Sequence, residues 1–132
     1  MKDVRRQQII EAFEDWDKLK QKGIWFSGFE NHGVYKRWHK NGQLGVLAHY
    51  KRGNKHGSYK EWFENGNLRK EANYINGDLD GEYREWWFDG KRYFVGHHKN
   101  GKKDGDFKEW TRSGKLVLHV IYKDGERVKQ LV

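Results

Sequence analysis

Short runs of alternating apolar and polar residues fill positions 24–132, and a glycine follows nearly every run. These glycines recur at alternating spacings of 11 and 13 residues, which leaves room for strands of about 5 to 8 residues. Most of them follow Asn or Asp, and such pairs favour tight hairpin turns because both residues accept a positive φ. The pairs are Asn41-Gly42, Asn65-Gly66, Asn76-Gly77, Asp89-Gly90, Asn100-Gly101 and Asp124-Gly125. The pattern predicts a series of β-hairpins.

The hairpins form a repeat. Four segments of 24 residues follow one another without gaps, at 33–56, 57–80, 81–104 and 105–128, and a half-repeat at 24–32 precedes them. The third position of each segment is Tyr35, Tyr59, Tyr83 or Phe107, and the sixth is Trp38, Trp62, Trp86 or Trp110. We therefore predict a mainly β fold, in which about four 24-residue hairpin repeats form an antiparallel β-meander of about nine or ten strands.

Residues 1–23 have a different pattern. Apolar residues from Ile9 to Leu19 recur at helical spacing, Asp3 can serve as an N-cap, and Gly23 suits a helix C-terminus. We predict an amphipathic helix over roughly residues 3–22 that caps the first strands of residues 24–132, since terminal repeats need a cap.

Composition narrows the setting of the protein. The 132 residues contain no Cys and no Pro, so a disulfide framework or a thiol nucleophile is excluded and no proline interrupts the sheet. No apolar run approaches the roughly 20 residues of a membrane span, and acidic residues interrupt the N-terminal segment where a signal peptide would be apolar. A cytoplasmic protein is expected.

The repeated pattern G-x-Y-K-x-W-x-x-N-G-x-L…Y-x-x-G-x-x-x-G resembles the MORN repeat variant found in bacterial proteins of the YwqK antitoxin family. The resemblance covers roughly residues 24–128. It implies a meandering β-sheet that binds other molecules and, in the YwqK-like branch, neutralises a cognate toxin. MORN repeats in general are also linked to scaffolding and acidic lipids. Repeat 3 departs from the pattern at Arg92, Gly96 and His98.

The aromatic columns favour a structural role, as cross-strand ladders of rings, over a ligand-stacking platform. No residue indicates an enzyme: Ser and Thr lie outside any nucleophile motif, and Glu61, Glu85 and Glu109 are expected to pair with the neighbouring Lys60, Arg84 or Lys108. Consecutive His97 and His98 point to opposite faces of a strand, so they cannot hold one metal ion. We expect neither metal nor cofactor.

The net charge of +8 is concentrated in the first repeat. Residues 33–56 contain no acidic side chain, whereas the rest of the chain is nearly balanced. A solvated sheet face and an anion-binding patch are both consistent with this composition. The candidate anion-binding residues are Lys36, Arg37, Lys40, Lys51, Arg52 and Lys55.

The third repeat carries additional aromatic residues around its first turn. The other repeats mostly have polar residues at these positions, and rings beside basic side chains are typical of protein interfaces. The alternative is that the rings pack on a neighbouring subunit or on the helix. The candidate partner-binding residues are Trp87, Phe88, Arg92, Tyr93 and His97.

The sequence favours a non-enzymatic binding protein over a catalyst. The first hypothesis is an antitoxin-like, immunity-like or inhibitory protein that docks a partner protein on its repeat sheet. The alternative is a binder of anionic ligands, such as a nucleotide, nucleic acid or acidic lipid head group, through the basic first repeat.

Overall fold

The computed structural model describes residues 24–27 and 32–132. Within these two ranges every regular element is a β-strand, and all strands belong to one antiparallel sheet. The helix expected over residues 3–22 lies outside the described residues, as does part of the half-repeat at 24–32, so those predictions are not tested.

Each repeat contributes one six-residue strand and one eight-residue strand. The six-residue strands are β2 (Gly33–Trp38), β5 (Gly57–Trp62), β8 (Gly81–Trp86) and β11 (Gly105–Trp110). The eight-residue strands are β3 (Leu44–Lys51), β6 (Leu68–Ile75), β9 (Arg92–Lys99) and β12 (Leu116–Lys123). The remaining strands are β1 (Ile24–Ser27), β4 (Asn54–Lys55), β7 (Asp78–Leu79), β10 (Lys102–Lys103) and β13 (Glu126–Gln130).

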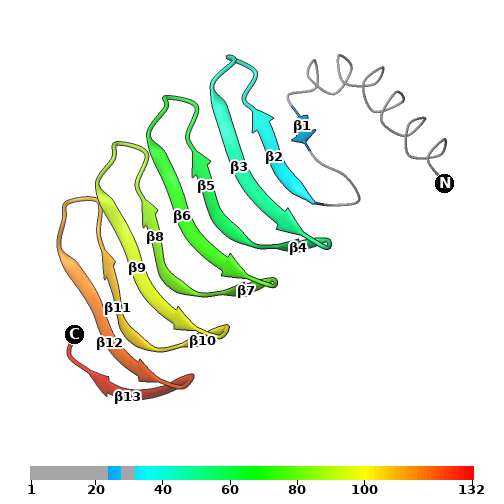
Figure 1. The fold of residues 1–132 in the computed structure, drawn as a ribbon. Helices are drawn as coiled ribbons and strands as arrows, with labels where there is room; N and C mark the ends of the chain where they lie inside the picture. The colour runs from blue at the N-terminus through cyan, green and yellow to red at the C-terminus, as the bar shows by residue number, and fades with distance from the viewer. Residues whose placement is uncertain (1–23, 28–31) are drawn as a thin grey trace, which may run out of the picture.

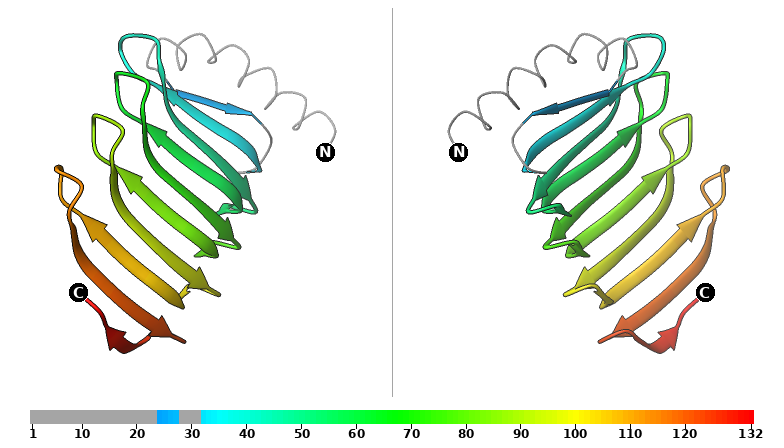
Figure 2. Two further views of the ribbon diagram at one scale, coloured as in Figure 1. Left: turned by 90° about the vertical axis from the view of Figure 1, so that its left-hand side faces the viewer. Right: turned by 90° about the vertical axis from the view of Figure 1, so that its right-hand side faces the viewer.

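The strand order in the sheet follows the chain from β1 to β13, and the two-residue strands β4, β7 and β10 pair only with the ends of β3, β6 and β9. Successive hairpins therefore lie side by side (Figure 1). The result is a single curved layer (Figure 2). The predicted antiparallel meander of hairpins is confirmed.

The two turns of each repeat differ in conformation. The turns after the eight-residue strands are tight, and both of their central residues have positive φ, as at Asn76 (φ 49°) and Gly77 (φ 90°). The loops after the six-residue strands are wider, and only their glycine is left-handed, as at Gly66. Here the expectation of two positive φ values was wrong, because the Asn65 side chain instead accepts a hydrogen bond from the backbone N–H of Asn67 at 3.0 Å. We call the two sheet margins the long-loop edge and the tight-turn edge.

A β-bulge recurs beside each long loop. Glu85 pairs with Phe94 and Trp86 pairs with Arg92, so Tyr93 has no partner opposite it. The same skip leaves Gly45, Arg69 and Val117 unpaired in the other repeats. A bulge turns its extra residue out of the regular alternation of faces, and these four residues lie beside the long-loop edge.

The tyrosine and tryptophan columns lie on opposite faces of the sheet, because their positions are three residues apart in regular strands. We call these the tyrosine face and the tryptophan face. On the tyrosine face each ring lies across from a small residue of the next strand, as Tyr59 does from Ala72. The buried centre of the sheet forms along this row and includes Ala48 (0% exposed), Ala72 (3%), Phe107 (3%) and Val120 (3%).

The predicted ladder of rings takes another form. Tyr35 and Tyr59 are separated by strand β3, and two strand spacings amount to about 10 Å. Rings instead pair within a hairpin: Tyr59 meets Tyr74 edge to face, with ring centroids 5.9 Å apart. Lysine ammonium groups cover such pairs, and Lys55 Nζ lies 4.4 Å from the Tyr59 centroid.

Candidate functional site

Two aromatic side chains of repeat 3 are in tilted ring contact at the long-loop edge, with an interplanar angle of 49°. The Trp87 and Tyr93 ring centroids are 4.3 Å apart, because the bulge directs Tyr93 toward the loop that carries Trp87. The Trp87 indole N–H donates to the backbone carbonyl of Trp110, 3.3 Å away in the next repeat. The nearby charge of the Glu109 carboxylate raises the pKa of the Tyr93 hydroxyl. Both rings are therefore held in place before any partner arrives.

Phe88 is the most exposed ring of this group. Its exposed fraction is 58%, and its ring meets Phe63 of the preceding repeat edge to face, with centroids 5.3 Å apart. The side-chain amides of Asn65 and Asn67 both donate to the Phe88 carbonyl, at 3.0 and 3.1 Å. The loop backbone that presents Phe88 is thus tied to repeat 2.

These four residues form an aromatic strip that spans two consecutive long loops. We define the aromatic strip as Phe63, Trp87, Phe88 and Tyr93. Two exposed arginines flank it: Arg112 lies 5.2 Å from the Trp87 ring and Arg69 lies 5.7 Å from the Phe63 ring. Rings with neighbouring guanidinium groups are the composition typical of interface hot spots.

Two of the predicted partner-binding residues lie apart from this strip. Arg92 stands on the tryptophan face, 4.4 Å from the Trp110 ring. His97 lies on the same face, 3.8 Å from a Glu82 carboxylate oxygen. Sequence reasoning also missed Phe63, although Phe63 occupies the same repeat position as Trp87 and could have been found by that correspondence.

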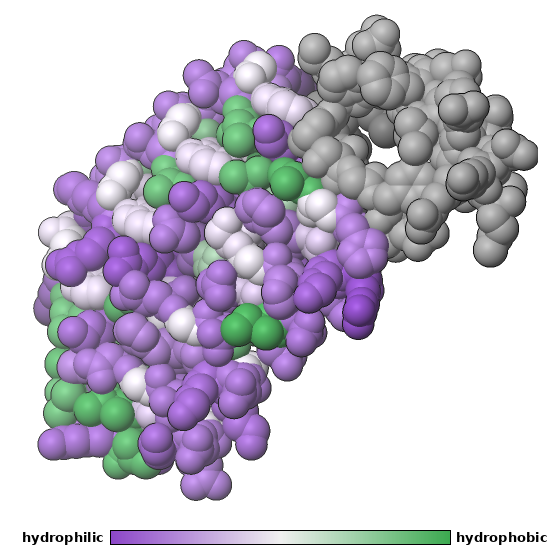
Figure 3. All heavy atoms as spheres, viewed as in Figure 1, coloured by the Kyte–Doolittle hydropathy of each residue, from purple (hydrophilic) through white to green (hydrophobic). Residues whose placement is uncertain are grey.

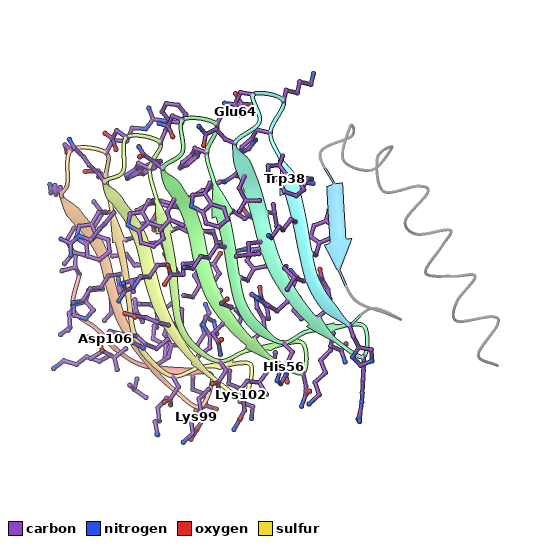
Figure 4. All side chains as sticks on the ribbon, turned by 45° about the horizontal axis from the view of Figure 1, so that its top comes forward. Trp38, His56, Glu64, Lys99, Lys102 and Asp106 are labelled. Atoms are coloured by element: carbon purple, nitrogen blue, oxygen red, sulfur yellow. The ribbon has the colours of Figure 1, made fainter. Side chains whose placement is uncertain are left out.

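The basic first repeat does not gather its charges in one place. Lys36 and Arg37 are consecutive in β2 and therefore lie on opposite faces. Lys40 belongs to the long-loop edge, whereas Lys51 and Arg52 belong to the tight-turn edge, and the length of β3 separates these edges by roughly 25 Å. Lys55 lies on the tyrosine face. The two edges are also seen in Figure 4, where Glu64 marks one, and His56, Lys99 and Lys102 mark the other.

The carboxylates beside the tryptophans pair with tyrosines. The Tyr59 hydroxyl donates to Glu61 and the Tyr83 hydroxyl donates to Glu85. The expected partner Lys60 lies next to Glu61 in the strand and so points to the other face. Burial, and then the hydrogen bond to the carboxylate, raises the pKa of Tyr59 and of Tyr83. These hydroxyls stay protonated at neutral pH and hold the carboxylates in place.

The MORN repeat variant model matches residues 31–52, 55–76 and 103–124, together half of the chain. The chain belongs to the MORN repeat variant family. The matched MORN segments share the 24-residue period of the hairpins, whereas the third hairpin, which holds Trp87 and Tyr93, is not among them. Among curated proteins, none matches the chain.

Within residues 24–27 and 32–132, no group of three or more His, Asp or Glu side chains is placed to hold a metal ion. No helix in this part of the MORN chain is long and apolar enough to cross a membrane. The surface viewed in Figure 3 is largely hydrophilic, with hydrophobic side chains gathered over the C-terminal strands, and Val128 is 59% exposed there.

Proposed function

We propose that this MORN-variant chain is a non-enzymatic binding protein that docks a partner protein through its aromatic strip and inhibits that partner, in the manner of an antitoxin. The observation that carries the proposal is Phe88, a large ring that is 58% exposed and meets the Phe63 ring edge to face, with Arg69 beside Phe63. Single exposed apolar residues are ordinary, but a cluster of rings beside guanidinium groups is what interfaces are enriched in.

Preorganisation supports the proposal. Trp87 is held by the Tyr93 ring and by the Trp110 carbonyl, and the Phe88 backbone is held by two amides of repeat 2. Immobilising side chains when a partner binds lowers affinity, and here the side chains are already ordered in the folded chain, so less binding free energy is lost. Neighbouring hairpins supply the Trp110 carbonyl and the two amides, so the position of the strip depends on the stacking of the repeats.

Charge supports an acidic partner. The chain carries a net charge of +8, and Arg69 and Arg112 flank the strip, although Arg69 Nε already lies 3.9 Å from a Glu61 carboxylate oxygen. An acidic rim around an apolar centre on the partner would complement these side chains and speed association. The antitoxin role is favoured by the sequence resemblance to the YwqK-like branch.

The test is a photo-crosslinking experiment in the native host. A benzoylphenylalanine at position 88 should capture a defined protein, whereas the same group at Ile75, which is 44% exposed at the tight-turn edge, should not. The captured protein is then purified and titrated. Trp87→Ala and Phe88→Ala should each weaken its binding roughly 30-fold or more, as at a hot spot, and Ile75→Ala should leave it unchanged.

Inhibition is tested with the same variants. Expression of the captured protein should slow growth, and co-expression of the wild-type chain should restore it, whereas Trp87→Ala and Phe88→Ala should not. The opposite result is steeply salt-dependent binding of heparin or single-stranded DNA that is lost when Arg37, Lys51 and Arg52 are changed to Glu. That result would replace the partner-protein proposal with an anionic ligand.

A further inference from the structure

On the tyrosine face, the regular arrangement is broken at two positions of repeat 3 and at one neighbouring position at the end of repeat 2. His98 stands where the other repeats have tyrosine, Gly96 stands where they have alanine or valine, and Leu79 stands where Lys55 and Lys103 cover ring pairs. All three positions belong to one patch, because His98 lies beside Tyr83 and Leu79 belongs to the short strand just before β8. The tyrosines replaced by His98 are Tyr50, Tyr74 and Tyr122.

A depression of about 460 Å³ lies over this part of the sheet, and His98 and Leu79 line it, whereas the space above Gly96 is filled by the Phe107 ring. Its apolar lining includes Tyr83, Phe94 and Phe107, whose rings meet edge to face at 5.9 Å in each successive pair. Binding sites for small molecules have volumes of roughly 300–1,000 Å³ and mostly apolar linings with a few polar groups. Size and lining therefore suit a small flat molecule.

His98 supplies the first polar group. Its Nδ1 is buried and has no hydrogen-bond partner, the one such side-chain atom among the described residues. A buried N–H without an acceptor is costly, so the ring proton belongs on Nε2. Nε2–H is then a hydrogen-bond donor available to a ligand in the depression, which the His98 ring helps to line.

Lys103 supplies the second polar group of the depression. Its ammonium group lies 5.2 Å from the Phe107 ring and 4.8 Å from the Tyr122 ring, and Lys103 pairs directly with His98 across β9 and β10. Glu85 also lines the depression, but at the other end from His98. Gly81 is the cross-strand partner of His98, and Glu85 is four residues further along β8, so the backbones of His98 and Glu85 are roughly 13 Å apart. The His98 end therefore offers donors and positive charge.

We infer that this depression is a binding site for a small carboxylate with a flat apolar body, such as an aromatic acid. The body lies over Phe94 and beside Tyr83, whose ring Lys70 Nζ approaches at 5.1 Å from the centroid. The carboxylate accepts hydrogen bonds from His98 Nε2 and Lys103 Nζ. Tyr93 lines this depression and also belongs to the aromatic strip, but His98 and Lys103 lie outside the strip, so the inference does not rest on the proposed function.

The probe is indole-3-acetate, with the uncharged indole-3-acetamide as its control, titrated into the isotope-labelled full chain while His98 ring resonances are followed by NMR. We expect saturable shifts centred on repeat 3 with a dissociation constant on the order of 1 mM or tighter. The amide should bind at least about tenfold more weakly, because it loses the charge-assisted hydrogen bonds.

Two variants and a matched control locate the site. Lys103→Leu, which copies Leu79 of repeat 2, should weaken binding about tenfold, whereas Lys55→Leu removes the equivalent lysine of repeat 1 and should not. His98→Tyr restores the residue of the other repeats, should fill the depression and should abolish binding in a chain that still melts cooperatively. Equal binding of the amide, equal loss in Lys55→Leu, or no saturable shift up to about 10 mM would overturn the inference.

Discussion

The Phe107 ring lies against the backbone of Gly96 and leaves no room for a methyl group on that residue. A Cβ built on Gly96 would lie 2.5 Å from Cε1 of Phe107, and Phe107 is 3% exposed. The Gly96 φ is not left-handed, so backbone conformation does not require glycine at this position. Its requirement is steric: the ring of one strand lies on the bare backbone of the next.

Gly96→Ala should therefore lower the free energy of unfolding by about 1–3 kcal/mol, because the added methyl group overpacks a buried site. Alanine normally stabilises a chain relative to glycine when the backbone accepts it, so the sign of the effect is diagnostic. Urea denaturation of wild type and variant measures it. In a Phe107→Leu background the methyl group should cost much less, and an unchanged or larger cost there would contradict the steric explanation.

The period of the fold could be read from the sequence because turn glycines and alternation are local signals. The hairpins, their order and the strand positions follow from these alone. The conformation of the loops could not be read from the sequence. Asn65 and Asn76 both precede glycine, but the φ of Asn76 is left-handed and the φ of Asn65 is not. What separates them is the number of residues between the strands, which the dipeptide does not encode.

The structure brings only some of the predicted partner-binding residues together, for a similar reason. Trp87, Phe88 and Tyr93 are together, but Arg92 and His97 follow the alternation of β9 onto the tryptophan face. If β9 had no bulge, strict alternation of side chains between the two faces would also have directed Tyr93 away from the loop that carries Trp87. The bulge between Glu85 and Trp86 brings it there, and bulges leave no clear mark in a single sequence.

Arg52 lies at a tight-turn position where the other repeats have Asn or Asp, and its φ is 53°. A left-handed conformation costs an ordinary side chain about 1–2 kcal/mol, whereas Asn tolerates it better. Arg52→Asn should raise the free energy of unfolding by about 0.5–1 kcal/mol. Asn76→Ala, which makes the reverse change at the equivalent turn, should lower it by a similar amount; equal melting temperatures for the three proteins would show that these turns contribute no strain.

His98 should make stability depend on pH. Burial, followed by the charges of Lys103 and His97, lowers the pKa of His98 below its ordinary value of about 6.5. The unfolded chain then binds this proton at a higher pH than the folded chain, so stability is complete above the unfolded pKa and falls as pH decreases through about 6.5. Thermal melts at pH 7.5 and 5 should show a larger loss for wild type than for His98→Tyr, and an equal loss would mean that His98 titrates normally.

The tryptophan column should contribute unequally along the chain. Trp110 is 8% exposed, because Arg92 covers its ring at 4.4 Å, whereas Trp62 is only partly buried. The cost of a truncation grows with the apolar surface that was buried and with the cavity left behind. Trp110→Ala should therefore lower the free energy of unfolding by about 3–5 kcal/mol, and Trp62→Ala by roughly half as much.

Circular dichroism during urea denaturation follows the whole sheet in both variants and avoids the fluorescence lost with either ring. Because each repeat contacts only its neighbours, the Trp110 variant should lose amide protection first in β11 and β12. Equal losses of stability in the two variants would show that position in the repeat, and not burial, determines what each tryptophan contributes.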